Sequence, residues 1–285
     1  MRPAHVVKIT TPKKFVLNGL WFGAKKPKQL IIIVHGMYSS AFSLQHVVES
    51  LVSPTTAVMT FNNRGFEGVA DIRQRVGKKR KHYLAGTAHE VFTDCIDDIQ
   101  GAVNFAKKAG AKEIYLAGHS TGCQKSIYWA SKTGGRDVKG IVLLAPLSDY
   151  AVDRNNPKRI SAIKQAREMI KTGKKHDLLP KKAWPLLLDA QRFLSLNTPD
   201  STEEIFSYAQ PEKTPRVYAS VRVPVLALFA DKDEYAERSA EKMIAWFAKN
   251  TGSRYFRAGI VPKVGHSFRG GEKRVAQLVK QWISA

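Results

Sequence analysis

A serine between two glycines is the strongest chemical signal in this sequence of 285 residues. Gly118, Ser120 and Gly122 lie between a strand predicted over 113–117 and a helix predicted over 123–131. The glycines permit a sharp turn whose tip exposes the serine hydroxyl. The helix that follows would direct its first amide groups and the positive end of its dipole at the same point. The pattern predicts Ser120 as a nucleophile; the alternative is an ordinary glycine-rich turn between a strand and a helix.

A serine hydroxyl needs a neighbouring base, and the chain offers eight histidines. His266 lies after the last predicted strand, 254–260, and before the last predicted helix, 272–283. A loop at the carboxyl end of one parallel strand can reach the same end of its neighbour, so we expect His266 to be the base. His119 adjoins the serine on a tight turn and should point elsewhere. His35 is expected to orient a loop through hydrogen bonds.

The imidazole in turn needs a carboxylate that fixes its tautomer and stabilises the imidazolium. The strand predicted over 223–229 is followed by Ala-Asp-Lys-Asp-Glu. We expect Asp233 to be the acid rather than Asp231, because Asp233 lies further around the turn. Asp149, after the preceding strand, is a possible substitute. Asp231 and Glu234 fit equally well as the solvated start of a helix.

The oxyanion that forms during attack on an ester needs hydrogen-bond donors. The backbone amide of Thr121, directly after the serine, is the first expected donor. The second is the backbone amide of Met37, in the loop that follows the apolar run 30–34. Gly36 would let that loop approach the substrate closely.

Apolar runs alternate with helical stripes, which predicts an α/β fold with a mostly parallel, eight-stranded sheet flanked by helices. The run 30–34 (Leu-Ile-Ile-Ile-Val) indicates a strand buried on both faces. The first two strands are expected to form an antiparallel pair. The expected strands are 6–9, 15–22, 30–34, 57–61, 113–117, 139–145, 223–229 and 254–260.

A segment without a strong strand separates two parts of the predicted core. Residues 147–222 contain helical stretches broken by Gly, Pro and Asn. We expect an inserted helical lid over the carboxyl edge of the sheet, with the core of the fold formed by residues 1–146 and 223–285. The expected lid helices are 157–171, 180–196 and 202–209.

The chain is strongly basic, with 46 Lys and Arg against 24 Asp and Glu and a formal net charge of +22. Such a field attracts polyanions and anionic surfaces. The basic residues from Arg73 to Lys81 lie in a Gly-rich, basic segment, 64–86, which we expect to be a long loop. A nucleic-acid or anionic-ligand patch is the alternative for this run. We do not expect nucleic acid as the partner.

Two cysteines, Cys95 and Cys123, are too few for a disulfide framework in a chain of this length. This favours a reducing compartment, and we expect a cytoplasmic protein. The sequence has no apolar run of about eighteen residues, so no membrane span is expected. The N-terminus lacks the apolar stretch of a secretory signal.

The motifs together resemble those of the α/β-hydrolase superfamily over nearly the whole chain. The sequence is most similar to a poorly characterised esterase-like branch of that superfamily. The similar segments are Phe-Asn-Asn-Arg-Gly at 61–65, the Glu-x-Phe-x-Asp-Cys-x-x-Asp-Ile pattern at 90–99 and Gly-His-Ser-Thr-Gly-Cys-Gln at 118–124. The last segment also resembles fungal siderophore-esterase relatives.

The resemblance implies Ser120 as nucleophile, Asp233 as acid and His266 as base, in the chain order usual for this fold. Ala230 departs from the glycine that many members have, which bears on the choice between the aspartates of that turn. Haloalkane dehalogenases and epoxide hydrolases are similar to this chain but use aspartate in place of the serine. Serine at this position therefore points to acyl chemistry.

We expect a carboxylic-ester hydrolase that acts on small to medium esters, anionic ones included, through an acyl-enzyme. The sequence contains no HExxH, CxxC, GxGxxG or GxxxxGK[ST] pattern, so neither a metal nor a nucleotide cofactor is expected. An acyltransferase or a thioesterase would use the same three residues. A non-catalytic protein that binds anionic ligands or nucleic acid on this fold is the third alternative, which the net charge motivates.

Overall fold

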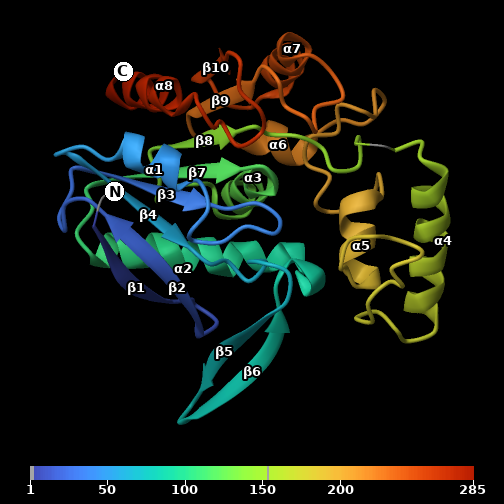
Figure 1. The fold of residues 1–285 in the computed structure, drawn as a ribbon. Coiled ribbons are helices and arrows are strands. Elements are labelled where there is room, and N and C mark those ends of the chain that lie inside the picture. Colours follow the sequence, from blue (N-terminus) through green and yellow to red (C-terminus); the bar gives the residue numbers. More distant parts are fainter. Residues whose placement is uncertain (1–2, 153) are drawn as a thin grey trace.

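A mixed sheet of ten strands runs through the molecule (Figure 1). The computed structural model describes residues 3–152 and 154–285. The sheet order is β10-β9-β8-β7-β3-β4-β2-β5-β6, and β1 pairs with β2. The strands are β1 (Ala4–Thr10), β2 (Phe15–Phe22), β3 (Gln29–Val34), β4 (Thr56–Phe61), β5 (Ala70–Val76), β6 (Lys79–Ala85), β7 (Glu113–His119), β8 (Gly140–Leu144), β9 (Val225–Ala230) and β10 (Phe256–Val261).

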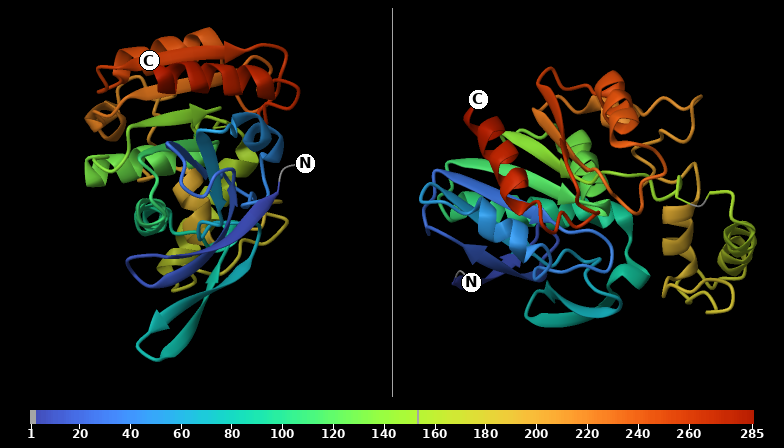
Figure 2. Two further views of the ribbon diagram at one scale, coloured as in Figure 1. Left: turned by 90° about the vertical axis from the view of Figure 1, so that its left-hand side faces the viewer. Right: turned by 45° about the horizontal axis from the view of Figure 1, so that its top comes forward.

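Helices cover both faces of the parallel part of the sheet (Figures 1 and 2). Leu30 and Ile32 of β3 belong to the core cluster on the side of α2 and α3, whereas Ile31 and Ile33 belong to the cluster on the side of α1 and α8. This alternation explains why the strand is apolar at every position from Leu30 to Val34. The helices are α1 (Gln45–Leu51), α2 (Cys95–Lys108), α3 (Thr121–Thr133), α4 (Pro157–Lys171), α5 (Ala190–Asn197), α6 (Arg216–Ser220), α7 (Ala240–Asn250) and α8 (Glu272–Ser284), with short 3₁₀ turns at Thr87–His89 and Phe92–Asp94.

All eight expected strands are present, but the sheet has ten, because the segment 64–86 is not a long loop. It contains the antiparallel hairpin of β5 and β6. Ile72 is buried, and the ring of Tyr83 packs against that of Phe15 with centroids 5.2 Å apart. These apolar side chains alternate with basic ones that face solvent, so one apolar face holds the hairpin to the sheet edge despite its charge.

The segment 147–222 contains α4, α5 and α6. Helices α4 and α5 share a small core of their own, which includes Ala166, Leu188 and Phe193. The helix expected over 180–196 begins only at Ala190, where the Asp189 side chain caps it by accepting from the Arg192 amide. The expected helix 202–209 is a series of turns instead.

Those turns have a packing role. Phe206 and Tyr208 are buried in the main core, beside Tyr218 of α6. Prolines at 211 and 215 follow them and limit helix formation there. Of the helices in residues 3–152 and 154–285, none is long and apolar enough to cross a membrane.

Candidate active site

Ser120 occupies a strained turn between β7 and α3. Its φ of 54° and ψ of −129° lie outside the regions that a residue with a side chain prefers. The glycines on either side allow the strand and the helix to approach: a Cβ at Gly118 would overlap the carbonyl of Gly122, and one at Gly122 would overlap the carbonyl of Val34. The turn thus presents the serine at the carboxyl end of the sheet.

His266 and Asp233 form a hydrogen-bonded pair beside this turn. His266 Nδ1 lies 2.9 Å from Asp233 Oδ2 and 3.0 Å from Oδ1. A carboxylate can only accept, so Nδ1 carries the proton and Nε2 is left as an acceptor. The amide of Tyr235 also donates to Asp233, over 3.0 Å. Asp231 instead faces the amide of Lys263, at 3.4 Å.

Two further residues hold His266 in place, and sequence reasoning missed both roles. The His266 amide donates to Glu234 Oε2 over 2.9 Å. The His266 carbonyl accepts from His119 Nε2 over 2.9 Å, and the two imidazole rings lie 4.9 Å apart. His119 therefore turns towards the base, although the tight turn led us to expect otherwise. Burial, with a smaller effect of His266, lowers the pKa of His119 to about 4 and keeps it neutral.

Ser120 and His266 line one cavity. No hydrogen bond joins their side chains in the part of the chain that the structure describes. Such contacts commonly tighten only when substrate is bound. The loop after β3 lies directly against the serine, because a Cβ at Gly36 would come within 2.8 Å of Ser120 Cβ. Met37 follows this glycine and lines the same cavity.

Thr121 is the first residue of α3, where backbone amides have no partner within the helix. Its side chain is fully buried. The two amides expected to stabilise an oxyanion thus belong to the segments that flank Ser120 on either side. Both amides are backbone groups of segments packed next to the serine. Donors that are already in place before the reaction are what stabilisation of an oxyanion requires.

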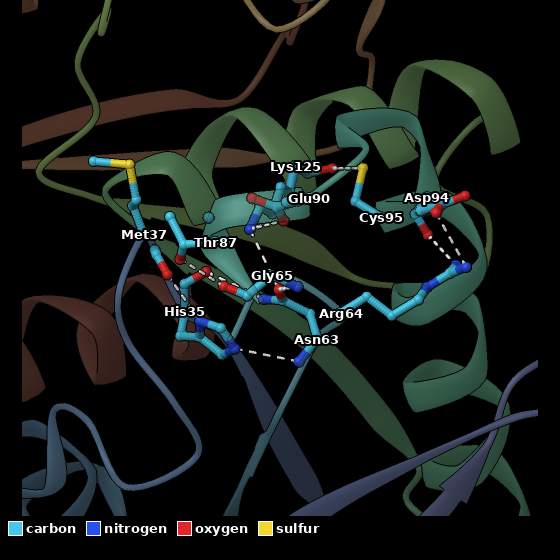
Figure 3. Close-up of polar contacts among 12 residues, drawn as sticks. His35, Met37, Asn63, Arg64, Gly65, Thr87, Glu90, Asp94, Cys95 and Lys125 are labelled. Carbon is cyan, nitrogen blue, oxygen red and sulfur yellow. Dashed lines mark hydrogen bonds and ion pairs between the residues drawn. The ribbon is translucent and has the colours of Figure 1, made fainter. Parts of the chain in front are cut away.

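A buried polar network holds the loop that carries Met37 (Figure 3). His35 Nδ1 donates to the Gly36 carbonyl over 2.8 Å, and His35 Nε2 accepts from the Asn63 amide over 3.2 Å. Asn63 Nδ2 in turn donates a hydrogen bond to the His35 carbonyl over 3.3 Å. Burial and the nearby charge of Lys125 lower the pKa of His35 to about 3, so the ring stays neutral and keeps both bonds.

The network continues into buried ion pairs. Lys125 of α3 is fully buried and lies 2.5 Å from Glu90 and 3.3 Å from Asn63 Oδ1. Arg192 of α5 is also fully buried and contacts Glu90 at 2.8 Å as well as Glu203. Burial alone would raise the pKa of Glu90, but Lys125 and Arg192 hold it below its ordinary value. Glu90 therefore joins α3 to α5, and Asn63 connects Lys125 to the loop after β3.

The cavity has a volume of about 440 Å³, within the range of small-molecule sites. Apolar side chains dominate its lining, among them Met37, Leu147, Trp184, Leu186 and Leu188. Asp149 and Arg159 add two polar groups to the wall. No group of three or more His, Cys, Asp or Glu that could hold a metal occurs among residues 3–152 and 154–285.

Comparison with known proteins identifies a family and similar folds. A family model described as "Protein of unknown function (DUF1749)" matches residues 88–285, which include Ser120, Asp233 and His266. No curated protein matches the sequence. Many solved structures are similar over nearly the whole chain, and the following three esterases are among them.

The esterase Pf2001 from Pyrococcus furiosus is 17% identical, with a TM-score of 0.62 over 99% of this chain and 91% of that one. Est1E from Butyrivibrio proteoclasticus with bound ferulic acid is 20% identical, with a TM-score of 0.62 over 97% of both chains. The carboxylesterase CesB from Bacillus subtilis is 18% identical, with a TM-score of 0.59 over 99% of this chain and 92% of that one. These likenesses confirm the α/β-hydrolase fold.

Proposed function

We propose that this chain, which belongs to the DUF1749 family of proteins of unknown function, is a serine hydrolase that cleaves carboxylic esters. The observation that supports this most strongly is the pairing of His266 with Asp233 at the cavity that Ser120 lines from its strained turn. A binding protein has no need of a base, an orienting acid and a partly exposed serine at one cavity. The fold's esterase neighbours add support at the level of the fold.

The proposed reaction has two halves. His266 Nε2 takes the proton from Ser120 Oγ as the oxygen attacks the ester carbonyl, and Asp233 stabilises the imidazolium. The amides of Met37 and Thr121 stabilise the oxyanion. The tetrahedral intermediate collapses to an acyl-enzyme, and His266 returns the proton to the departing alcohol. Water, activated by His266, then hydrolyses the acyl-enzyme and restores Ser120.

The cavity suggests the class of substrate. Its volume of about 440 Å³ and its apolar wall suit a small to medium ester with an apolar acyl or alcohol part. Residues of the segment 147–222, including Val152, Trp184 and Leu188, supply much of that wall, so we propose that this segment is the lid of the site. The net charge of +22 favours approach of anionic esters.

The two cysteines are free and buried, which fits a reducing compartment, so the proposal includes a cytoplasmic location. Cys95 and Cys123 also have thiol pKa values that burial raises well above the ordinary value. Neither is a plausible alternative nucleophile, because catalysis by cysteine requires the thiolate.

The test is hydrolysis of p-nitrophenyl acetate, butyrate and octanoate by the native chain and by Ser120→Ala. We expect turnover by the native protein, best with the shorter chains, and its loss in the variant. Absence of turnover by native protein that is folded by circular dichroism would count against the proposal. The products formed with dilute added alcohol separate hydrolysis from acyl transfer. Free acid as the main product would support a hydrolase, and a new ester as the main product would support an acyltransferase.

A further inference from the structure

The β5–β6 hairpin extends away from the body of the molecule (Figures 1 and 2). Its sequence is rich in Lys and Arg. Residues 70–85 include a single carboxylate, Asp71. None of them lines the cavity that contains Ser120, so the proposed esterase activity leaves this charge without a role. The six Lys and Arg residues of the hairpin are Arg73, Arg75, Lys78, Lys79, Arg80 and Lys81.

Strand register gathers some of these cations on one face of the sheet. Arg75 pairs with Arg80 across the hairpin, and Arg73 pairs with Val16 of β2. Lys8 of β1 pairs with Asn18, two residues along β2. Directly paired residues project from the same face, as do alternate residues along a strand. Register therefore directs the side chains of Lys8, Arg73, Arg75 and Arg80 to one face, opposite the core packing of Ile72.

A cavity of about 360 Å³ lies on this face and is lined by all four cations. Val16, which shares this face with Arg73, contributes apolar surface to it. Asp71 also lines the cavity, and its carboxylate is paired with the imidazole of His82 at 2.6 Å. Within residues 3–152 and 154–285, no carboxylate forms an ion pair with these four cations.

The arrangement is electrostatically unfavourable when it is empty. Like charges directly opposite each other on antiparallel strands destabilise the pairing, and Arg75 faces Arg80 in this way. A ligand with several negative charges would remove that repulsion. Guanidinium groups suit phosphate in particular, because their planar donors bind two phosphate oxygens at once.

We propose that this cavity binds a group carrying several clustered phosphates, held by Lys8, Arg73, Arg75 and Arg80. The concave shape and small volume favour a compact oligophosphate over a nucleic-acid duplex, whose backbone contacts are spread along an extended surface. The same chemistry can come from a free oligophosphate or from the headgroup of a phosphorylated inositol lipid. The site lies outside the esterase cavity, so its occupation is independent of the proposed hydrolysis.

Calorimetric titration with tripolyphosphate at about 150 mM KCl, where the long-range field is largely screened, tests the site directly. The double variant Arg75→Gln/Arg80→Gln removes the facing guanidiniums. The double variant Lys79→Gln/Lys81→Gln is the matched control, because it removes the same charge from the same hairpin on its other face. We expect the first pair to weaken binding about tenfold or more and the control to change it less than about twofold.

Vesicles of phosphatidylcholine, with and without phosphatidylinositol bisphosphate, identify the source of the phosphates. Sedimentation of the protein with the phosphorylated vesicles, lost in Arg75→Gln/Arg80→Gln, would support the site and assign it to a lipid headgroup. Binding of tripolyphosphate without binding of vesicles would support it and assign it to a free ligand. Failure to bind either probe, or equal weakening by the two double variants, would overturn the proposal. A duplex DNA bound more tightly than tripolyphosphate, and equally by both variants, would overturn it too and indicate only a diffuse attraction.

Discussion

At the scale of single residues, the candidate site depends on which carboxylate faces the base. Sequence reasoning ranked Asp233 above Asp231 from its place in the turn, and the structure pairs Asp233 with His266 at 2.9 Å. The bond from the His266 amide to Glu234 was not predictable, because it depends on how two loops meet in space. The turn sequence at 230–234 shows three acids but not their directions.

Replacement of Asp233 by Asn should lower kcat for p-nitrophenyl butyrate by about 10³–10⁴-fold. The amide would favour the wrong tautomer of His266 while keeping nearly the same shape. Asp231→Asn is the matched control, since its carboxylate faces the Lys263 amide, and we expect less than about a twofold change. Equal loss in both variants would mean that the acid had been assigned to the wrong residue.

Asp149 gives a prediction about pH and stability. Burial, with smaller contributions from Glu203 and Glu204, raises its pKa from 3.8 to about 7. A raised carboxyl pKa means that the folded state holds the proton more tightly than the unfolded state, so stability from this group falls as pH rises from about 4 to about 7. Asp149→Asn should therefore stabilise the protein more at pH 8 than at pH 5, by on the order of 1–3 kcal/mol.

Urea unfolding of both proteins at the two pH values measures this difference. Gln124 Nε2 donates to Asp149 at 3.0 Å, a bond that the Asn oxygen can keep. An identical stability difference at both pH values would show that Asp149 has an ordinary pKa in the folded protein.

At the scale of elements, the pattern of apolar residues was enough to predict the parallel strands but not the β5–β6 hairpin. Strands such as β3 are apolar at consecutive positions because both faces are covered, and this signal is easily read. In β5 and β6 the apolar residues Ile72 and Tyr83 alternate with polar and basic ones, but apolar residues are so few in these strands that the alternation does not identify them as strands. Helix α5 begins at Ala190 rather than at the expected residue 180, because Pro185 precedes it and Asp189 caps it.

The contact between β3 and α3 yields a prediction at this scale. A Cβ at Gly122 would overlap the Val34 carbonyl, so Gly122→Ala must push the helix that begins at the serine away from the sheet. We expect it to lower the free energy of unfolding by about 1–3 kcal/mol and to reduce kcat. Gly259→Ala is the control, because its Cβ would meet Leu228 at an ordinary 3.4 Å. Comparable stability of the two variants in urea would contradict the close packing of strand and helix.

At the scale of the whole molecule, an apolar cavity and a cationic cavity lie in different parts of the fold. The apolar cavity with Ser120 lies at the carboxyl end of the parallel strands, beneath the segment 147–222. The cationic cavity lies at the antiparallel edge, on the face of the β5–β6 hairpin. Composition predicted the sign of the charge, and the run from Arg73 to Lys81 showed where it is dense, but the sequence did not show which cations share one face, because that depends on strand register.

The buried ion pairs link the two halves of the chain. Lys125 of α3 and Arg192 of α5 both contact Glu90, so the segment 147–222 is fastened to the helix that follows the serine. No periodicity in the sequence marks a fully buried lysine, because lysine normally lies at the surface. This network of ion pairs could therefore not be predicted from the sequence.

Covalent labelling of the nucleophile tests the central claim most directly. The native protein and Ser120→Ala would each be incubated with a fluorophosphonate, digested and analysed by mass spectrometry. We expect one adduct on the peptide that contains Ser120, lost in the variant and greatly slowed in His266→Gln. A folded native protein that stays unlabelled, or an adduct on another serine that persists in Ser120→Ala, would contradict the assignment of Ser120 as the nucleophile.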